Sequence, residues 1–188
     1  MTYRTYIFDL DGTLLDTLAD LAASVNYALH THGMPARSID DVRRFVGNGV
    51  RLLMEHSLDT TRPYPGIPES LAALRARDCR IAVVSNKMMA ATQELCHHFF
   101  PDVVEVAIGE HEAEGIRKKP APDTVFAALK SLGVGKEGAV YVGDSDVDIS
   151  TARNAGIPCI SVLWGFRNRD FLLHHGATTF VAAPEELL

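Results

Sequence analysis

Two aspartates separated by a single residue, Asp9 and Asp11, are the groups in this sequence best suited to chemistry. They belong to the segment Asp9-Leu10-Asp11-Gly12-Thr13, which follows a short apolar run. Ligands of open α/β sheets bind beyond the carboxyl ends of the strands, so reactive carboxylates are expected at such a position. Gly12 allows the backbone to turn sharply and to approach a ligand closely. Taken alone, the motif suits an acidic turn ahead of a helix about equally well.

Three later polar segments also follow apolar runs. They are Ser85-Asn86-Lys87, Lys118-Lys119-Pro120-Ala121-Pro122-Asp123 and Gly143-Asp144-Ser145-Asp146-Val147-Asp148. Each segment alone is typical of a turn or a helix cap. Because the carboxyl ends of parallel strands meet at one edge of a sheet, the recurrence of these segments in order predicts a shared crevice.

A crevice that gathers Asp9, Asp11, Asp144 and Asp148 would need a cation. Two like unit charges about 4 Å apart repel by about 4 kcal/mol at an effective dielectric constant of 20, so several unpaired carboxylates would not stay ionised. Oxygen ligands without a nearby cysteine or histidine favour a hard, octahedral ion. The residue types therefore indicate Mg²⁺ rather than Zn²⁺.

The elements that must position these groups are short apolar runs separated by helical patterns. Short β-branched runs without polar alternation are typical of strands buried on both faces, which predicts an α/β fold with a doubly wound parallel sheet. The runs are Tyr6–Phe8, Ile81–Val84, Val103–Ile108, Ala139–Val142, Ile160–Leu163 and Phe180–Ala182. Helices are expected between them, at residues 68–77, 88–98, 122–132 and 147–155.

Residues 16–65 break this alternation and predict a small helical insert after the first strand. They hold two or three helical patterns and no convincing strand. Residues 1–15 and 66–188 would then form the core. The prolines of residues 62–66 suit the return of the chain from one module to the other.

Capping patterns mark the expected helix starts within the insert. Apolar residues from Leu18 to Leu29 recur at a 3.6-residue spacing behind a Thr17–Asp20 capping pattern. Ser38 and Asp41 repeat the same pattern ahead of a second helix.

The composition excludes several classes of protein. The 188 residues carry a formal net charge of −6, with 47% hydrophobic and 22% charged residues, so general disorder is excluded. The negative charge argues against binding to nucleic acid or to an anionic membrane through bulk charge. An anionic ligand would instead meet the cations Lys87, Arg117, Lys118 and Lys119 on the strand-end loops, although most of the first three are expected to be solvated.

The cysteines bear on the cellular compartment. Cys79, Cys96 and Cys159 are widely spaced and follow no secretory signal, which favours a reducing cytoplasm over a disulfide framework. No apolar run approaches the roughly 20 residues that cross a bilayer. We therefore expect a cytoplasmic monomer or homodimer without a membrane or nucleic-acid partner.

In order and spacing, the four polar segments resemble the motifs of the haloacid dehalogenase (HAD) superfamily of aspartate-nucleophile phosphohydrolases, over nearly the whole chain. Three further segments look like its phosphoglycolate phosphatase-like branch: Phe45-Val46-Gly47-Asn48-Gly49, Tyr64-Pro65-Gly66 and Val162-Leu163-Trp164-Gly165. The resemblance implies a Rossmann-like HAD core with a helical cap. It also implies a Mg²⁺-dependent phosphatase that acts on a small phosphorylated metabolite, with phosphoglycolate as the leading substrate.

The same resemblance assigns roles to the acidic residues. Asp9 would attack phosphorus and form an aspartyl-phosphate. Asp11 would protonate the departing alcohol and then activate the water that hydrolyses the intermediate. The ligands of Mg²⁺ would be one oxygen of Asp9, the backbone carbonyl of Asp11, and Asp144, with Asp148 in support.

Other residues would bind the phosphoryl group, again by resemblance. Lys119 would offset its charge, while Ser85, Asn86 and the backbone amides after Asp9 would hold its oxygens. Gly12 and Thr13 are further candidates for the substrate site, Thr13 chiefly through the geometry of the loop.

The insert is shorter than the cap of such relatives, which usually carries about four helices, whereas residues 16–65 have room for about two or three. The missing material lies between Leu58 and Arg62. A cap contacts the non-reacting part of the substrate, so its truncation should alter selectivity before it alters the Asp9 chemistry. Asn48 and Arg51 are candidates for substrate contacts from the cap.

Three alternatives remain open. A sugar-phosphate mutase similar to β-phosphoglucomutase and a pyrophosphatase both reuse an aspartyl-phosphate, although a mutase must protect it from water, which a reduced lid makes harder. A non-catalytic phosphoryl receiver or binding module also gathers carboxylates, a hydroxyl and a lysine at strand ends. Its acidic pair is not arranged as in residues 9–13 with a helical insert behind it.

Overall fold

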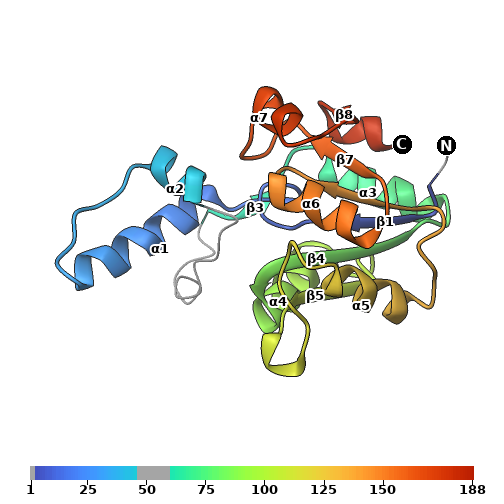
Figure 1. The fold of residues 1–188 in the computed structure, drawn as a ribbon, viewed down its shortest axis with the longest axis horizontal. Coiled ribbons are helices and arrows are strands. Elements are labelled where there is room, and N and C mark those ends of the chain that lie inside the picture. Colours follow the sequence, from blue (N-terminus) through green and yellow to red (C-terminus); the bar gives the residue numbers. More distant parts are fainter. Residues whose placement is uncertain (1–2, 46–59) are drawn as a thin grey trace.

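A computed structural model of the chain describes residues 3–45 and 60–188 (Figure 1). Six parallel strands form the central sheet in the order β5-β4-β1-β6-β7-β8. They are β1 (Thr5–Phe8), β4 (Arg80–Met88), β5 (Val106–Glu110), β6 (Ala139–Gly143), β7 (Cys159–Val162) and β8 (Phe180–Val181). The predicted α/β fold with a parallel sheet is confirmed.

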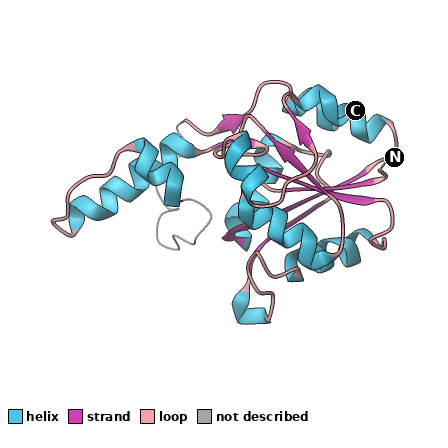
Figure 2. Cartoon of the chain, turned by 45° about the horizontal axis from the view of Figure 1, so that its top comes forward, coloured by secondary structure: helices cyan, strands magenta, loops and turns pink. Residues whose placement is uncertain are grey.

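Helices cover both faces of this sheet, so the strands run between two helical layers (Figure 2). Side chains from α3 (Ile67–Ala76) and α4 (Met89–Phe99) pack on one face, and those from α5 (Asp123–Leu132) and α6 (Asp146–Ala155) pack on the other. The alternation of side chains along β1 explains its wholly apolar character, because Phe8 joins the first cluster and Ile7 the second. The chain ends with α7 (Arg169–His174) and a 3₁₀ turn, η2 (Pro184–Leu187), and another 3₁₀ turn, η1 (Glu112–Glu114), follows β5.

The register of the central strands determines where the polar segments lie. Phe8, the last residue of β1, is level with Val83 of β4 and with Val142 of β6. The residues that follow these positions are therefore brought to one edge of the sheet. Sequence reasoning placed the functional groups at this edge.

The predicted helical insert is present between β1 and α3, and it extends away from the sheet at the left of Figure 1. It contains α1 (Leu18–Thr31) and α2 (Ile39–Phe45). Two short strands, β2 (Leu15–Asp16) and β3 (Arg62–Pro63), pair antiparallel where the chain leaves and re-enters the core. The prediction of no strand between Leu15 and Pro65 is therefore wrong, because two-residue strands are too short for a periodic pattern to reveal.

The predicted capping box at the start of α1 is also wrong. The Thr17 hydroxyl makes no cap hydrogen bond and instead donates to Asp11 Oδ1 at 2.8 Å. Asp20 accepts hydrogen bonds from the backbone N–H and hydroxyl groups of Thr60 and Thr61. Burial opposes the charge on Asp20, but these hydrogen bonds outweigh it and lower the pKa of Asp20. The acidic side chain thus ties the outgoing segment of the insert to the returning one.

The second capping pattern is confirmed. The Asp41 N–H donates to Ser38 Oγ at 3.1 Å, and the Ser38 N–H donates to Asp41 Oδ2 at 3.4 Å.

Within residues 3–45 and 60–188, no helix combines the length and the apolar character that a bilayer crossing requires.

Candidate active site

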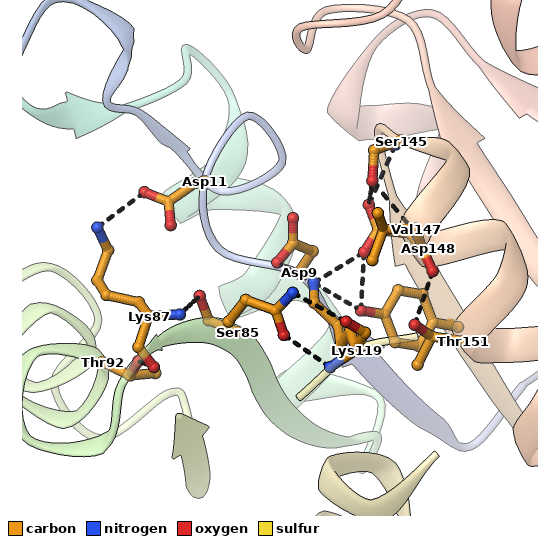
Figure 3. A network of polar contacts seen from close by, with 12 residues as sticks. Asp9, Asp11, Ser85, Lys87, Thr92, Lys119, Ser145, Val147, Asp148 and Thr151 are labelled. Carbon is orange, nitrogen blue, oxygen red and sulfur yellow. Dashed lines mark hydrogen bonds and ion pairs between the residues drawn. The ribbon is translucent and has the colours of Figure 1, made fainter. Parts of the chain in front are cut away.

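The loops after β1 and β6, the carboxyl-terminal part of β4 and the loop before α5 meet at the carboxyl edge of the sheet, as Figure 3 shows. Asp9 follows β1 and is held there by its N–H, which donates to Val142 O at 2.9 Å. The structure brings Asp9 together with Lys119, Asp144 and Asp148, all of which are buried. The predicted convergence of distant segments is therefore present.

Lys119 lies at the centre of this cluster. Its Nζ donates to Asp9 Oδ1 at 2.6 Å and to Asp148 Oδ1 at 2.8 Å. A third hydrogen bond of 3.2 Å reaches the hydroxyl of Tyr141, which itself donates to Asp148 Oδ1. Burial alone would lower the pKa of Lys119, but the charges of Asp148 and Asp9 outweigh burial and raise it. The lysine is therefore a fixed positive charge beside the Asp9 carboxylate.

Both oxygens of Asp148 are bound by the protein. Its Oδ2 accepts from the N–H and hydroxyl of Ser145 at 3.1 and 2.6 Å, while Ser145 Oγ accepts from the Asp148 N–H. This capping box begins α6, so the start of a helix orients the carboxylate toward Lys119. The arrangement suits a supporting role for Asp148.

The accumulation of carboxylates perturbs their protonation. Burial, and next the charge of Asp148, raise the pKa of Asp9 to about 7, although Lys119 opposes them. Burial and the charges of Asp148 and Asp9 raise the pKa of Asp144 well above its ordinary value. The cluster thus holds more negative charge than Lys119 compensates.

These residues fit a divalent cation. Asp9, Asp144 and Asp148 can each offer an oxygen within 4.8 Å of the others. The hydrogen bonds within the described residues use Oδ1 of Asp9 and Oδ2 of Asp144, which leaves their other oxygens open as ligands. All donor atoms are oxygens, a set that suits a hard ion such as Mg²⁺.

Two glycines allow the backbone to pack closely around Asp144. A Cβ on Gly12, whose φ is +84°, would lie 2.5 Å from Asp144 Oδ2. A Cβ on Gly165 would lie 2.3 Å from the Asp144 Cβ. The N–H of Phe166 then reaches Asp144 Oδ2 at 2.6 Å. The loop after β7 therefore orients this carboxylate, a contribution that the sequence patterns did not reveal.

The candidate phosphate ligands differ in their surroundings. Ser85 is buried beside the cluster, and its hydroxyl accepts from the Lys87 N–H at 3.0 Å. Both ends of the Asn86 amide bind the backbone of Lys119, at 2.7 and 3.1 Å, which favours a positioning role for Asn86. Thr13 is fully buried, and its carbonyl accepts from the Trp164 indole N–H at 2.9 Å, which supports a role in loop geometry.

The other predicted residues divide into three groups. Asp11 lies at the edge of the cluster and pairs with Lys87, whose Nζ is 3.2 Å from Asp11 Oδ1. Arg117 and Lys118 are exposed, as expected for most of the strand-end cations. The cap candidates Asn48 and Arg51 lie outside the described residues.

Sequence reasoning missed the role of Tyr141 and underestimated the burial of Lys87. Tyr141 lies inside the apolar run that forms β6, where a buried phenol needs a hydrogen-bond partner, and this requirement could have identified it. Lys87 was expected among solvated cations, yet its side chain is only 5% exposed. A buried lysine requires a counter-charge, and the sequence alone does not show which carboxylate supplies it.

Comparisons with known proteins agree with this geometry. Residues 3–156 match the model of a hydrolase family described as haloacid dehalogenase-like hydrolase. A phosphoglycolate phosphatase of Aquifex aeolicus is 34% identical, with 87% of this chain and 86% of the relative covered. An N-acetylmuramic acid 6-phosphate phosphatase of Pseudomonas aeruginosa is 28% identical over 100% of this chain and 94% of its own.

A solved structure is also similar to this chain, in both fold and sequence. The crystal structure assigned as a phosphoglycolate phosphatase of Lactobacillus delbrueckii subsp. bulgaricus superposes with a TM-score of 0.93 and 35% identity. The superposition covers 100% of this chain and 97% of the other. The similarity therefore extends over nearly the whole of both chains.

Proposed function

This chain belongs to the haloacid dehalogenase-like hydrolase family, as a phosphoric monoester hydrolase of the phosphoglycolate phosphatase-like branch, and we propose that it acts through an aspartyl-phosphate on Asp9. The observation that carries the proposal is the buried Asp9 carboxylate, one oxygen of which is held by Lys119 at 2.6 Å. This contact fixes the orientation of the carboxylate, one oxygen of which would attack phosphorus.

The reaction divides into two half-reactions. An Asp9 oxygen forms a bond to phosphorus as the bond between phosphorus and the alcohol oxygen breaks, and Asp11 gives its proton to that oxygen. In the second half-reaction Asp11 takes a proton from water, which attacks phosphorus and releases phosphate from Asp9. Lys119 offsets charge on the phosphoryl oxygens, and the buried Ser85 hydroxyl supplies a hydrogen bond to them.

A Mg²⁺ ion would be held by Asp9, Asp144 and the backbone carbonyl of Asp11, with Asp148 in support. When bound, it would neutralise the carboxylates and the phosphoryl oxygens. The raised pKa values of Asp9 and Asp144 support this proposal, because they reflect negative charge that a cation would stabilise. The loop after β7 keeps the Asp144 carboxylate in place through the N–H of Phe166.

The substrate is proposed to be a small phosphomonoester, with phosphoglycolate first. The 34% identical relative from Aquifex aeolicus supports this substrate, whereas the Pseudomonas aeruginosa relative acts on a larger sugar phosphate. We also propose that residues 16–65 act as the cap and residues 1–15 and 66–188 as the catalytic core. The β2–β3 pair at the boundary connects the two parts.

The test is release of inorganic phosphate from a panel of metabolites, with Mg²⁺ and with a chelator. We expect Mg²⁺-dependent release, fastest with phosphoglycolate. Absence of release from every phosphomonoester at any Mg²⁺ concentration would overturn the proposal. Conversion of a sugar 1-phosphate to its 6-phosphate without free phosphate would assign a mutase instead.

A further inference from the structure

The active site contains an ion pair between Lys87 and Asp11 whose lysine has no part in the chemistry described so far. The side chain of Lys87 is 5% exposed, and its Nζ lies 3.2 Å from Asp11 Oδ1. The hydroxyl of Thr17 donates to the same oxygen at 2.8 Å. In Figure 3, Lys87 approaches Asp11 from the end of β4, whereas Lys119 lies on the far side of Asp9.

The backbone around Lys87 is held from several directions. Its N–H donates to Ser85 Oγ at 3.0 Å, and its carbonyl accepts from the Thr92 hydroxyl at 3.4 Å. Gly109 of β5 lies against it so closely that a Cβ there would be 2.6 Å from the Lys87 carbonyl oxygen. The ammonium group therefore projects from a fixed point toward Asp11.

Because both donors bind Oδ1, the two oxygens of Asp11 have different roles. An oxygen that accepts from an ammonium group and from a hydroxyl has no room for a proton of its own. A proton carried by Asp11 consequently resides on Oδ2. The carboxyl group is also prevented from rotating, because rotation would break both contacts.

We propose that Lys87 is a positioning residue that holds Asp11 so that Oδ2 delivers its proton to the leaving alcohol. The inference rests on the proposed function, in which Asp11 is the general acid. As the phosphorus–oxygen bond breaks, the proton moves from Oδ2 to the alcohol oxygen. The resulting Asp11 carboxylate keeps its ion pair with Lys87 through Oδ1.

Leaving-group dependence separates this role from a merely structural one. An alkoxide leaves only with a proton, so hydrolysis of ethyl phosphate depends on a well-placed general acid. The p-nitrophenolate ion is stable without a proton, so hydrolysis of p-nitrophenyl phosphate does not. A general loss of structure at the site would slow both substrates alike.

The experiment compares kcat/KM for the two substrates in the wild type, in Lys87→Met and in Lys130→Met. Lys130 is exposed on α5 and serves as the matched control. Because general acids contribute about 10²–10⁴-fold, Lys87→Met should lose at least about tenfold with ethyl phosphate and less than about threefold with p-nitrophenyl phosphate. Lys130→Met should leave both values unchanged.

Equal losses with the two substrates, or no loss with ethyl phosphate, would overturn the inference while leaving the proposed function intact. No turnover by the wild type would overturn the proposed function and the inference with it. If Lys87→Met does not fold, Thr17→Val removes the second donor to Asp11 Oδ1 and should show the same preference at smaller magnitude. Equal losses in Thr17→Val would again contradict the inference.

Discussion

Replacing Lys119 by methionine removes the positive charge at the centre of the carboxylate cluster while keeping much of the side-chain volume. The contacts at 2.6 and 2.8 Å correspond to about 6 kcal/mol of attraction each at an effective dielectric constant of 20. The cost of burying the lysine offsets much of this attraction. Removal of one partner from a buried pair typically costs about 3–5 kcal/mol, which is the loss of unfolding free energy expected at pH 8 without metal.

The loss should be smaller at pH 5. The pKa of Asp9 in the folded protein is about 7, so Asp9 is largely protonated at pH 5 and its ion pair with Lys119 is then absent. The pair with Asp148 is the contact that remains. We therefore expect roughly half of the pH 8 effect at pH 5.

Urea denaturation of the wild type, Lys119→Met and Lys130→Met in the presence of a chelator measures both values. The exposed control should stay within about 0.5 kcal/mol of the wild type at each pH. A loss below about 1 kcal/mol at pH 8, or an equal loss at the two pH values, would refute the assignment of Lys119 as the counter-charge of Asp9.

Three further predictions concern the acidic site and the cap. Without metal, stability should fall as pH rises from about 4 to about 7, because the folded state raises the pKa of Asp9 from 3.8 to about 7 and thus binds the extra proton. Mg²⁺ at 100 times its Kd should raise the free energy of unfolding by about 2.7 kcal/mol. Thermal unfolding measures this stability across the pH range, and a pH dependence that Mg²⁺ does not change would contradict the prediction. Asp9→Asn should lower kcat by at least about 10³-fold with its circular dichroism unchanged, and retained turnover would exclude Asp9 as the nucleophile. Arg167→Ala removes donors to the carbonyls of Arg43 and Arg44 in α2, so amides of α2 should exchange hydrogen about fivefold faster. Unchanged exchange would show that this contact does not stabilise α2.

The parallel sheet and the convergence of polar segments at its edge were predictable because their signals are local and repeated. The runs that form β1, β4 and β6 are short and apolar, and each is followed by polar residues that a packed core does not require. Parallel pairing then brings those residues to one edge, as the alignment of Phe8 with Val83 and Val142 shows. The predictions for Asp9, Lys119 and Asp144 needed no knowledge of how individual side chains pair.

The remaining features depend on contacts between distant segments. The Thr17–Asp20 pattern has the composition of a capping box, but Asp11 and the returning chain compete for its two side chains and bind them. In the sequence Lys87 follows an apolar run as many solvated lysines do, and only the folded protein shows its pairing with Asp11. A local sequence pattern does not reveal which distant partner a side chain binds in the folded protein.

The central claim is that the Asp9 carboxylate receives the phosphoryl group. Asp11→Asn with p-nitrophenyl phosphate tests it directly, because the leaving group needs no proton whereas hydrolysis of the intermediate needs the Asp11 base. Rapid acid quenching followed by peptide mass spectrometry should find the phosphoryl group on Asp9. Continued turnover without an adduct, or an adduct on Ser85, would contradict the account.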